Sequence, residues 1–508
     1  MSGRGVAGFY ALAREQRDDV AVIEVDTGAS VTFGELADRV DRLSRAIERR
    51  VDPGGGVAVV LPNGIAALEV ELACAQLPVY FTPINWHLAP PEIAYILTDS
   101  GASLVITTEE HEIAVRAAFD AAGRDAEQLI VGRRGLDAIA GGQAEGPPAR
   151  RGTGQRMLYT SGTTGRPKGV RRPLPVGVPE DNLGLLAARA ALYGVDHPDG
   201  VHLVTAPMYH AAPGAYAIQA LHLGHRVVVM TAWTPEATLE LIETHRVTHT
   251  YMVPTMFSRL LALPVDQRRE AGVASLRSVV HTAAPCPVHV KQAMMDWFGP
   301  ILYEIYGGTE GGATIAAPDE WLAHPGTVGR ARSGVTIRIL DDDGNELPPG
   351  EPGAVYMSIP AQRFAYLNDP EKTASSRRGE FFTLGDIGYL DDEGYLYLCD
   401  RAADVVVSGG VNIYPAEVES ALLEHPAVTD AAVIGAPDDD WGERPVAHVV
   451  TSSAVKADEL IAHCRALIAG YKCPREIRFR DELPRSDVGK LLRRTLREEE
   501  WVGHDRRL

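Results

Sequence analysis

Cysteine and long apolar runs are both scarce in this sequence. Five cysteines occur among 508 residues, an odd number at wide spacing with no C-x-x-C pair, which excludes a disulfide framework and a zinc knuckle. They are Cys74, Cys286, Cys399, Cys464 and Cys473. Residues 1–5 lack the apolar core of a signal peptide, and the most apolar stretch, residues 57–84, is interrupted by Glu69 and Glu71. We therefore expect reduced thiols in a cytoplasmic protein without a membrane span.

Positive charge is also scarce. Asp and Glu number 68 against 49 for Lys and Arg, which gives a formal net charge of −19. Such a surface is unsuited to nucleic acid or to an anionic membrane, so an anionic ligand must meet locally concentrated positive charge. Lysine occurs only at positions 168, 291, 372, 456, 472 and 490. A lysine inside a motif is therefore a candidate functional residue.

The first 300 residues carry the pattern of parallel sheets covered by helices. The chain is long enough for at least two domains, with 45% hydrophobic and 23% charged residues and no internal repeat. Short β-branched runs alternate with helical patterns, which is typical of parallel α/β architecture. The expected strands are residues 57–60, 79–83, 104–107, 227–230, 250–253 and 278–281.

The pattern changes beyond residue 325. Turn signals such as Asp343-Gly344 and Pro349-Gly350 separate alternating strands and predict a small β-barrel or antiparallel layer up to residue 400. A compact α+β pattern follows, with strands near 405–407, 431–434 and 447–450 and helices near 416–423 and 457–469. The predicted fold class is α/β: an N-terminal domain, residues 1–400, of two helix-covered sheets and a distorted barrel, followed by a small α+β domain, residues 401–508.

Residues 159–169, YTSGTTGRPKG, are the most informative segment of the chain. Glycines let backbone N–H groups approach phosphate oxygens, hydroxyl groups donate further hydrogen bonds, and Lys168 adds charge. A flexible surface loop can share this composition, but the ordered string is far more specific. Its spacing differs from G-x-x-x-x-G-K-[ST], which excludes the P-loop NTPases.

The string resembles the phosphate loop of the adenylate-forming (ANL) superfamily, which contains acyl-CoA synthetases, nonribosomal adenylation domains and beetle luciferases. Further segments resemble that superfamily in its own order: residues 207–210, 253–257, 283–285, 306–310, 325–330, 383–386, 400–401, 408–417 and 484–490. The resemblance implies an AMP-forming acyl-CoA ligase. Such an enzyme uses ATP and Mg²⁺ to activate a carboxylic acid as an acyl-adenylate and then transfers the acyl group to CoA.

The resemblance also implies a nucleotide site. Tyr306 is expected to stack on adenine and Asp386 to bind the ribose hydroxyls, a task that suits its two acceptor oxygens. Arg401 would join Asp386 from the hinge between the domains. The other expected contacts with ATP or AMP are Thr160, Ser161, Gly162, Thr163, Thr164, Gly165, Lys168, Ala283, Ala284, Pro285, Glu304 and Gly307.

The implied catalytic groups come from both domains. Glu310 is expected to contact Mg²⁺, Thr309 to hydrogen-bond the α-phosphate, and Lys490 to stabilise charge in the adenylating transition state. Rotation of the C-terminal domain would then withdraw Lys490 and open a tunnel for the CoA thiol. Ser408, Gly409 and Gly410 are expected to line this tunnel. At the hinge, Ala403 stands where many relatives have Asp or Lys, and alanine tolerates both helical and extended angles.

The residues expected around the acyl pocket are small, and His210 is implied to stand where this pocket meets the thiol tunnel. They are Ala211, Ala212, Gly214, Gly307, Gly308, Gly311, Gly312 and Ala313. Small walls predict a roomy pocket, hence a bulky or medium-to-long apolar acid such as a fatty, aryl, steroid or terpenoid acid. No charged residue is expected to project into the pocket to recognise an α-amino group, which argues against an amino-acid-activating domain.

Other functions stay open on the sequence. The enzyme could perform only one half-reaction, or transfer its adenylate to the phosphopantetheine of a carrier protein instead of CoA. A catalytically inactive nucleotide-binding scaffold is the alternative from another class, and luciferase activity is the least favoured. A homodimer is compatible with the sequence, which leaves the oligomeric state open.

Overall fold

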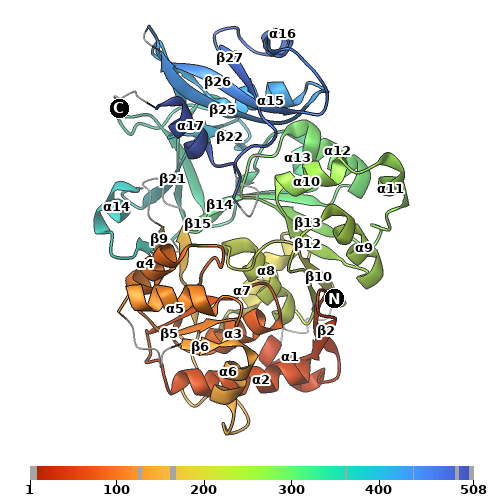
Figure 1. Cartoon of the computed structure of the whole chain (residues 1–508), viewed down its shortest axis with the longest axis vertical. Coiled ribbons are helices and arrows are strands. Elements are labelled where there is room, and N and C mark those ends of the chain that lie inside the picture. The colour runs from red at the N-terminus through yellow and green to blue at the C-terminus, as the bar shows by residue number, and fades with distance from the viewer. Residues whose placement is uncertain are drawn as a thin grey trace.

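The computed structural model describes residues 8–123, 129–160, 167–360, 363–438, 440–486 and 491–502. Helix-covered sheets form the larger part of the molecule, and a smaller α+β part at the top of Figure 1 carries the C-terminus. Among the described residues, none of the helices combines the length and apolar character needed to cross a bilayer.

The largest sheet joins the N-terminal strands to the middle of the chain, in the order β16-β15-β14-β13-β12-β10-β11-β1-β2. Its strands are β1 (Val20–Glu24), β2 (Ala29–Thr32), β10 (Val201–Val204), β11 (Arg226–Val229), β12 (His249–Met252), β13 (Ser278–His281), β14 (Leu302–Gly308), β15 (Gly311–Ala316) and β16 (Arg330–Ala331). The central strands are parallel, whereas β2, β15 and β16 are antiparallel to their neighbours. Its associated helices are α7 (Leu183–Ala191), α8 (Ala211–His222), α9 (Pro235–His245), α10 (Pro254–Leu261), α11 (Val265–Glu270), α12 (Val288–Phe298) and α13 (Pro318–Ala323).

A second sheet, in the order β6-β5-β3-β4-β7, is wholly parallel. Its strands are β3 (Gly56–Val60), β4 (Tyr80–Pro83), β5 (Ala102–Thr107), β6 (Leu129–Val131) and β7 (Gln155–Arg156). Every residue of β3 is buried, as expected for a strand covered on both faces. The helices around it are α1 (Phe9–Glu15), α2 (Phe33–Glu48), α3 (Ile65–Ala75), α4 (Pro90–Ser100), α5 (Glu112–Ala121) and α6 (Gly132–Ala140). A capping box between Thr32 and Glu35 starts α2.

The region after residue 325 is an antiparallel sheet, as the turn signals predict. It contains β17 (Thr336–Leu340), β18 (Gly353–Ser358), β20 (Arg377–Arg378), β21 (Phe381–Leu390) and β22 (Leu396–Arg401), with α14 (Pro370–Ser375) beside it. A small separate sheet joins β8 (Leu158–Thr160), β9 (Lys168–Arg171) and β19 (Ala365–Tyr366).

The C-terminal part has its own sheet and core. Its strands are β23 (Val406–Ser408), β24 (Val411–Ile413), β25 (Val428–Asp438), β26 (Gly442–Thr451) and β27 (Glu476–Phe479), and its helices are α15 (Pro415–Leu423), α16 (Ala457–Leu467) and α17 (Arg493–Glu500). The buried apolar clusters of this part contain only residues from Val406 onward. The division at residue 400 stays a prediction, with which this separation of cores is compatible.

Candidate active site

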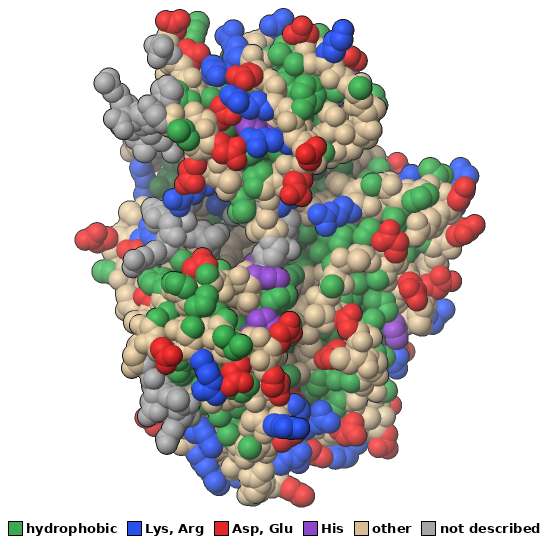
Figure 2. All heavy atoms as spheres, in the orientation of Figure 1, with side chains coloured by type: hydrophobic (Ala, Val, Ile, Leu, Met, Phe, Trp, Pro, Cys, Tyr) green, Lys and Arg blue, Asp and Glu red, His purple; other side chains and the backbone are tan. Residues whose placement is uncertain are grey.

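One cavity of about 3810 Å³ lies between the C-terminal part and the rest of the molecule. Figure 2 shows the surface hollowed there, with histidine and hydrophobic side chains on its border. Segments predicted to bind nucleotide and acid converge on this cavity. Those that line it are Thr160, Lys168, His210, Ala211, Ala283, Ala284, Pro285, Glu304, Tyr306, Gly307, Gly308, Thr309, Glu310, Gly311, Gly312, Asp386 and Arg401.

Two predicted elements lie outside the described residues: the loop residues Ser161, Gly162, Thr163, Thr164 and Gly165, and the lysine Lys490. The structure does describe the residues that flank them. The β8–β9 hairpin pairs Thr160 with Lys168, which brings the two ends of the phosphate loop together at the cavity. The Lys168 ammonium lies 2.9 Å from an Asp369 carboxylate oxygen.

Glu310 stands at the tip of the β14–β15 hairpin, with its side chain buried against the cavity wall. The Tyr366 hydroxyl donates a 2.7 Å hydrogen bond to Glu310 Oε1, which leaves the other carboxylate oxygen for a ligand. A Cβ on Gly308 would lie 2.7 Å from Glu310 Oε2, so glycine at 308 leaves that oxygen its space. Together these contacts orient the carboxylate.

The arrangement around Glu310 fits Mg²⁺ held together with nucleotide phosphates. In the described part of the chain, no group of three or more His, Cys, Asp and Glu side chains is placed to hold a metal by itself. Mg²⁺ commonly binds through one or two carboxylates plus substrate phosphates and water, rather than in an all-protein cage. A single oriented carboxylate beside a phosphate loop meets that requirement.

A second corner of the cavity joins Asp386 of β21 to Tyr306 of β14. The Tyr306 hydroxyl donates a 2.7 Å hydrogen bond to Asp386 Oδ2, and Arg401 Nε lies 3.5 Å from Oδ1. Arg401 is placed there because β21 and β22 pair Asp386 with Arg401 in register. Burial, followed by the Asp386 charge, raises the pKa of Tyr306 well above its usual value, so the phenol stays protonated as a donor.

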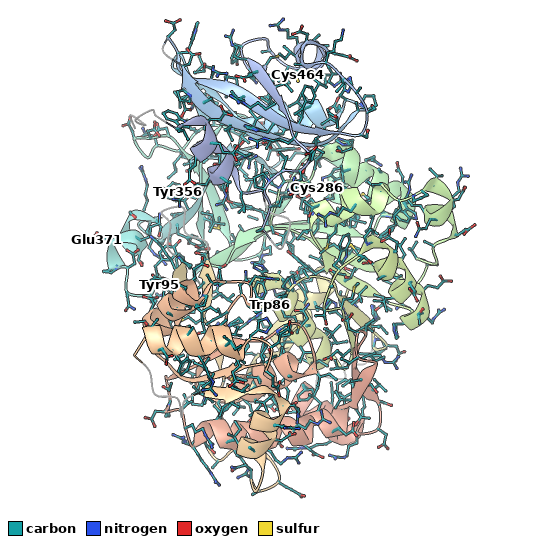
Figure 3. The ribbon with its side chains drawn as sticks, in the orientation of Figure 1. Trp86, Tyr95, Cys286, Tyr356, Glu371 and Cys464 are labelled. Atoms are coloured by element: carbon teal, nitrogen blue, oxygen red, sulfur yellow. The ribbon has the colours of Figure 1, made fainter. Side chains whose placement is uncertain are left out.

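Beneath the predicted adenine slot, Lys291 and Glu304 form a fully buried ion pair. Lys291 Nζ donates to Glu304 Oε2 at 2.7 Å and lies 4.8 Å from the centre of the Trp321 ring. One oxygen of the Glu304 carboxylate is therefore held by Lys291, while Glu304 also lines the cavity, and its predicted contact with nucleotide stays a prediction. Above this pair, Ala283 has φ of 78°, a left-handed conformation that is costly for alanine. Cys286, just beyond this segment, lies beneath the C-terminal part in Figure 3.

The small residues of the predicted acyl pocket have two different roles. A Cβ on Gly307 would lie 2.4 Å from Gly312 Cα, and one on Gly214 would lie 2.4 Å from Arg156 Nη2. Both glycines therefore permit close packing of chain segments, and Gly214 is buried outside the cavity lining. This corrects the inference that every small residue there widens the pocket.

Three arginines line this part of the cavity, none of which can recognise an α-amino group. Arg172 Nη2 donates to the Thr309 carbonyl at 2.7 Å, and Arg332 Nη2 donates to the Gly312 carbonyl. Arg189 joins them from α7 and donates from Nε to the Tyr193 hydroxyl at 2.8 Å. The motifs do not contain these arginines, and their separation in the chain hid their convergence. Tyr366 was missed for the same reason.

The C-terminal part presents the ends of the Lys490 segment to the cavity. Pro484, Arg485 and Leu491 line it, and Arg485 pairs with Leu491 in an isolated antiparallel bridge. Arg485 also binds Asp430 of β25 at 2.6 Å, which anchors the segment.

The segment predicted to bind CoA lies outside the lining of this cavity. Ser408, Gly409 and Gly410 form the turn between β23 and β24 and do not line this cavity, although all of them are described. The described residues that flank the Lys490 segment therefore line the cavity, whereas the predicted thiol-tunnel residues do not.

The hinge backbone is bonded on both sides. The Ala402 N–H donates to the Gly385 carbonyl at 2.9 Å, while Arg497 of α17 donates to the Ala403 carbonyl at 2.8 Å. Both alanines are exposed. The backbone groups of Ala402 and Ala403 therefore hold the hinge in place, and the alanine side chains do not contribute hydrogen bonds.

Comparison with known proteins agrees with this geometry. The profile of the family "AMP-binding enzyme" matches residues 9–366, and that of its C-terminal domain matches residues 417–490. The chain belongs to the AMP-binding enzyme family. It is an adenylate-forming acid–thiol ligase of the acyl-CoA synthetase type, and ATP, Mg²⁺ and CoA are the cofactors of such enzymes.

Individual relatives cover almost the entire chain. A feruloyl-CoA synthase from an Amycolatopsis species is 37% identical over 96% of this chain and 98% of its own. The o-succinylbenzoate CoA synthetase of Bacillus subtilis, solved with its acyl-adenylate, superposes with a TM-score of 0.80 at 29% identity over 98% of each chain. An amide bond synthetase from Marinactinospora thermotolerans superposes with a TM-score of 0.83 at 26% identity, over 97% of this chain and 99% of its own.

Proposed function

We propose that this ligase converts a bulky carboxylic acid with an apolar body into its CoA thioester through an acyl-adenylate. One observation carries the proposal: the stem of the phosphate loop, the Glu310 carboxylate, the Asp386–Arg401 corner and the flanks of the Lys490 segment all border one cavity. Apolar side chains of the same cavity supply the wall for the acid. They include Ala212, Tyr216, Tyr251, Ile305 and Ile315.

In the first half-reaction, a carboxylate oxygen of the acid attacks the α-phosphorus of ATP. An oxygen–phosphorus bond forms, the bond to the β-phosphate bridge breaks, and pyrophosphate leaves. Mg²⁺ at Glu310 supplies positive charge that stabilises the phosphates when it is bound. Thr309 and Lys490 hold the α-phosphate and the carboxylate in place, and Asp386 fixes the ribose, so that the reacting atoms meet in line.

In the second half-reaction, the CoA sulfur attacks the acyl carbon, and the acyl–oxygen bond breaks to release AMP. The C-terminal domain, residues 401–508, rotates about Arg401 to withdraw Lys490 and to bring Ser408–Gly410 to the site. His210 borders the point of attack. The conformation described above corresponds to the adenylating state, because the flanks of Lys490 face the nucleotide corner.

The test is to incubate the purified enzyme with ATP, Mg²⁺, CoA and a panel of acids, and to measure pyrophosphate and acyl-CoA in the same samples. Lys490→Ala is expected to abolish pyrophosphate release, whereas Lys456→Ala, an exposed lysine at the start of α16, is the matched control and should behave as wild type.

Each other outcome selects an alternative. Pyrophosphate without acyl-CoA would indicate a different acceptor, such as a carrier-protein thiol or an amine. Acyl-CoA from a synthetic acyl-adenylate, with no pyrophosphate from any acid, would indicate an isolated second half-reaction. ATP binding without any acid-dependent product would indicate an inactive scaffold and would contradict the proposal.

A further inference from the structure

Three arginines from separate elements converge on the acyl side of the cavity without a carboxylate partner. Arg172 follows β9, Arg189 lies on α7 and Arg332 follows β16. None of the ion pairs between described residues includes any of the three. Their hydrogen-bond partners are the Thr309 and Gly312 carbonyls and the Tyr193 hydroxyl, which are neutral.

Several other basic side chains on the cavity wall have carboxylate partners. Arg156 has Glu71 at 3.2 Å, Lys168 has Asp369 at 2.9 Å, and Arg485 has Asp430 at 2.6 Å. Arg172 and Arg332 are half-buried and Arg189 is exposed to the cavity, and a guanidinium keeps its charge in either setting. The trio therefore differs from these pairs in presenting charge to the cavity without a carboxylate partner among the described residues.

The trio is close enough to act on one ligand. All three line one cavity, and Arg172 and Arg332 donate to the carbonyls of Thr309 and Gly312, at the β14–β15 turn. Burial, and after it the charge of Arg189, lowers the pKa of both Arg172 and Arg332. The Nε atoms of Arg172 and Arg332 are buried without a hydrogen-bond partner among the described residues. Arg189 is accessible from the cavity and, apart from its bond to Tyr193, is available to a ligand.

The position of the trio distinguishes the distal end of the acid from the ATP phosphates. Arg172 lies nearest the predicted phosphate site, since it donates to the carbonyl of Thr309, the neighbour of Glu310. Arg189 donates to the Tyr193 hydroxyl, the Tyr193 and Tyr216 ring centroids are 5.6 Å apart, and the Tyr216 ring stacks on Tyr251 with centroids 5.8 Å apart. Arg189 thus lies on the aromatic side of the pocket, and Arg332 bonds the Gly312 carbonyl on the far strand of the β14–β15 hairpin.

We propose that Arg189 and Arg332, supported by Arg172, bind a second anionic group at the distal end of the acid substrate. The inference rests on the proposed function and sharpens it: the acid has an apolar or aromatic body and a carboxylate or sulfonate at its far end. It also agrees with the exclusion of amino acids, because cations repel an ammonium group. The arginines act as specificity-determining residues and do not touch the reacting atoms.

The experiment compares cinnamates that differ only at the para position, with methyl, hydroxyl or carboxylate, by acid-dependent exchange of pyrophosphate into ATP. Wild type should favour 4-carboxycinnamate over 4-methylcinnamate in kcat/KM by about 30-fold or more, the effect of a charge-assisted hydrogen-bonded pair. Arg189→Leu should lower kcat/KM for the carboxylate about 30-fold, mainly through KM, and leave the methyl compound within about 3-fold. Arg332→Met should act in the same direction, and Arg189→Lys should restore part of the loss.

Arg269→Leu, an exposed arginine of α11, is the matched control, and the thermal midpoint of each variant shows whether it is folded. Preference of wild type for the methyl or the hydroxyl compound would overturn the assignment. The assignment would also be overturned if the arginine variants raised the KM for ATP equally with all three acids, because the trio would then bind phosphates.

If no acid supports exchange, the proposed function has failed, and the inference is judged separately by calorimetric titration of the three cinnamates. Tighter binding of 4-carboxycinnamate to wild type, lost in Arg189→Leu, would support the anion site. Equal or absent binding of all three would overturn it.

Discussion

The two ends of the largest sheet surround ionisable groups differently. At the carboxyl ends of β12, β13 and β14 the strands lead into the cavity, where permanently charged arginines lie without carboxylate partners in the part of the chain that the structure describes. At the amino ends of β10, β11 and β12, His202, His225 and His249 form a buried cluster with His197, with ring centroids 4.9–6.0 Å apart. Ligands of open α/β sheets bind outside the carboxyl ends of the strands.

The contrast is between histidine side chains that become neutral when buried and arginine side chains that keep their charge. Burial lowers the pKa of His202 to about 3 and of His225 to about 4, so these rings stay neutral at neutral pH. Arginine has no neutral form in proteins and keeps its charge. The amino-end cluster therefore holds neutral rings alone, whereas the cavity end combines the neutral ring of His281 with arginines that have no carboxylate partner among the described residues.

The largest effect is expected at the ribose corner of the cavity end. Asp386→Ala removes two acceptor oxygens, and each hydrogen bond to a charged group contributes about 1.5–3 kcal/mol. We expect kcat/KM for ATP to fall about 100- to 1000-fold, with the free energy of unfolding lowered by about 1–3 kcal/mol because the buried Tyr306 hydroxyl loses its acceptor. Steady-state kinetics at varied ATP and urea denaturation measure the two quantities. A normal KM for ATP would show that Asp386 does not bind the ribose.

The buried ion pair beneath the adenine slot should show what an uncompensated charge costs. Lys291→Met leaves Glu304 alone in the interior and should lower the free energy of unfolding by about 3–5 kcal/mol. The double variant Lys291→Met, Glu304→Leu should recover most of that loss. Denaturant unfolding measures the free energy of unfolding of both variants. If the double variant is no more stable than the single one, the buried Glu304 charge is not the cause of the loss.

Acid should lower the stability of the fold through the histidine cluster at the amino ends of β10, β11 and β12. Because the folded pKa values of His202 and His225 lie below that of an unfolded histidine, the unfolded chain binds more protons as pH falls below about 6.5. Stability is then fully present above that pH and is lost below it, by about 2 kcal/mol for each of the two rings at pH 5. Neighbouring charges at Asp196, Asp199 and Arg277 modulate the effect. In urea denaturation at pH 7 and pH 5, His202→Phe should weaken the pH dependence, and an unchanged slope would contradict the assignment.

The smallest effect separates stability from specificity at the cavity end. Arg189→Leu removes an uncompensated charge that is accessible from the cavity, so the free energy of unfolding should rise or stay constant within about 1 kcal/mol. Chemical denaturation measures this. A loss of more than about 2 kcal/mol would mean that Arg189 is a structural residue, which would weaken the case for a ligand.

Local sequence patterns predicted much of this architecture. The β-branched run at residues 278–281 is a strand with the same limits, and the expected strands near 57, 104 and 250 are within two residues of β3, β5 and β12. The glycines after Tyr306 extend β14 and begin β15 around Glu310. Close strand approach, and not a loop, requires those glycines.

Most of the described motif residues line one cavity, but their partners could not be foreseen. Tyr366 reaches Glu310 across 56 residues of sequence, and Arg172 reaches Thr309 across 137. Such pairs depend on strand order in space, for which a single sequence carries no local signal. The Lys291–Glu304 ion pair escaped prediction for the same reason, since Lys291 lies on α12.

The most direct test of the account is acid-dependent pyrophosphate exchange at pH 7.5 in two variants, with each rate normalised to the folded fraction of the protein. Glu310→Gln changes the cavity end of the sheet, and the account predicts a loss of exchange activity of about 100-fold or more, since an oriented charge in the transition state is removed. His249→Phe changes the opposite end, and the account predicts the wild-type exchange rate per folded molecule. Equal loss in both variants, or full activity in Glu310→Gln, would contradict it.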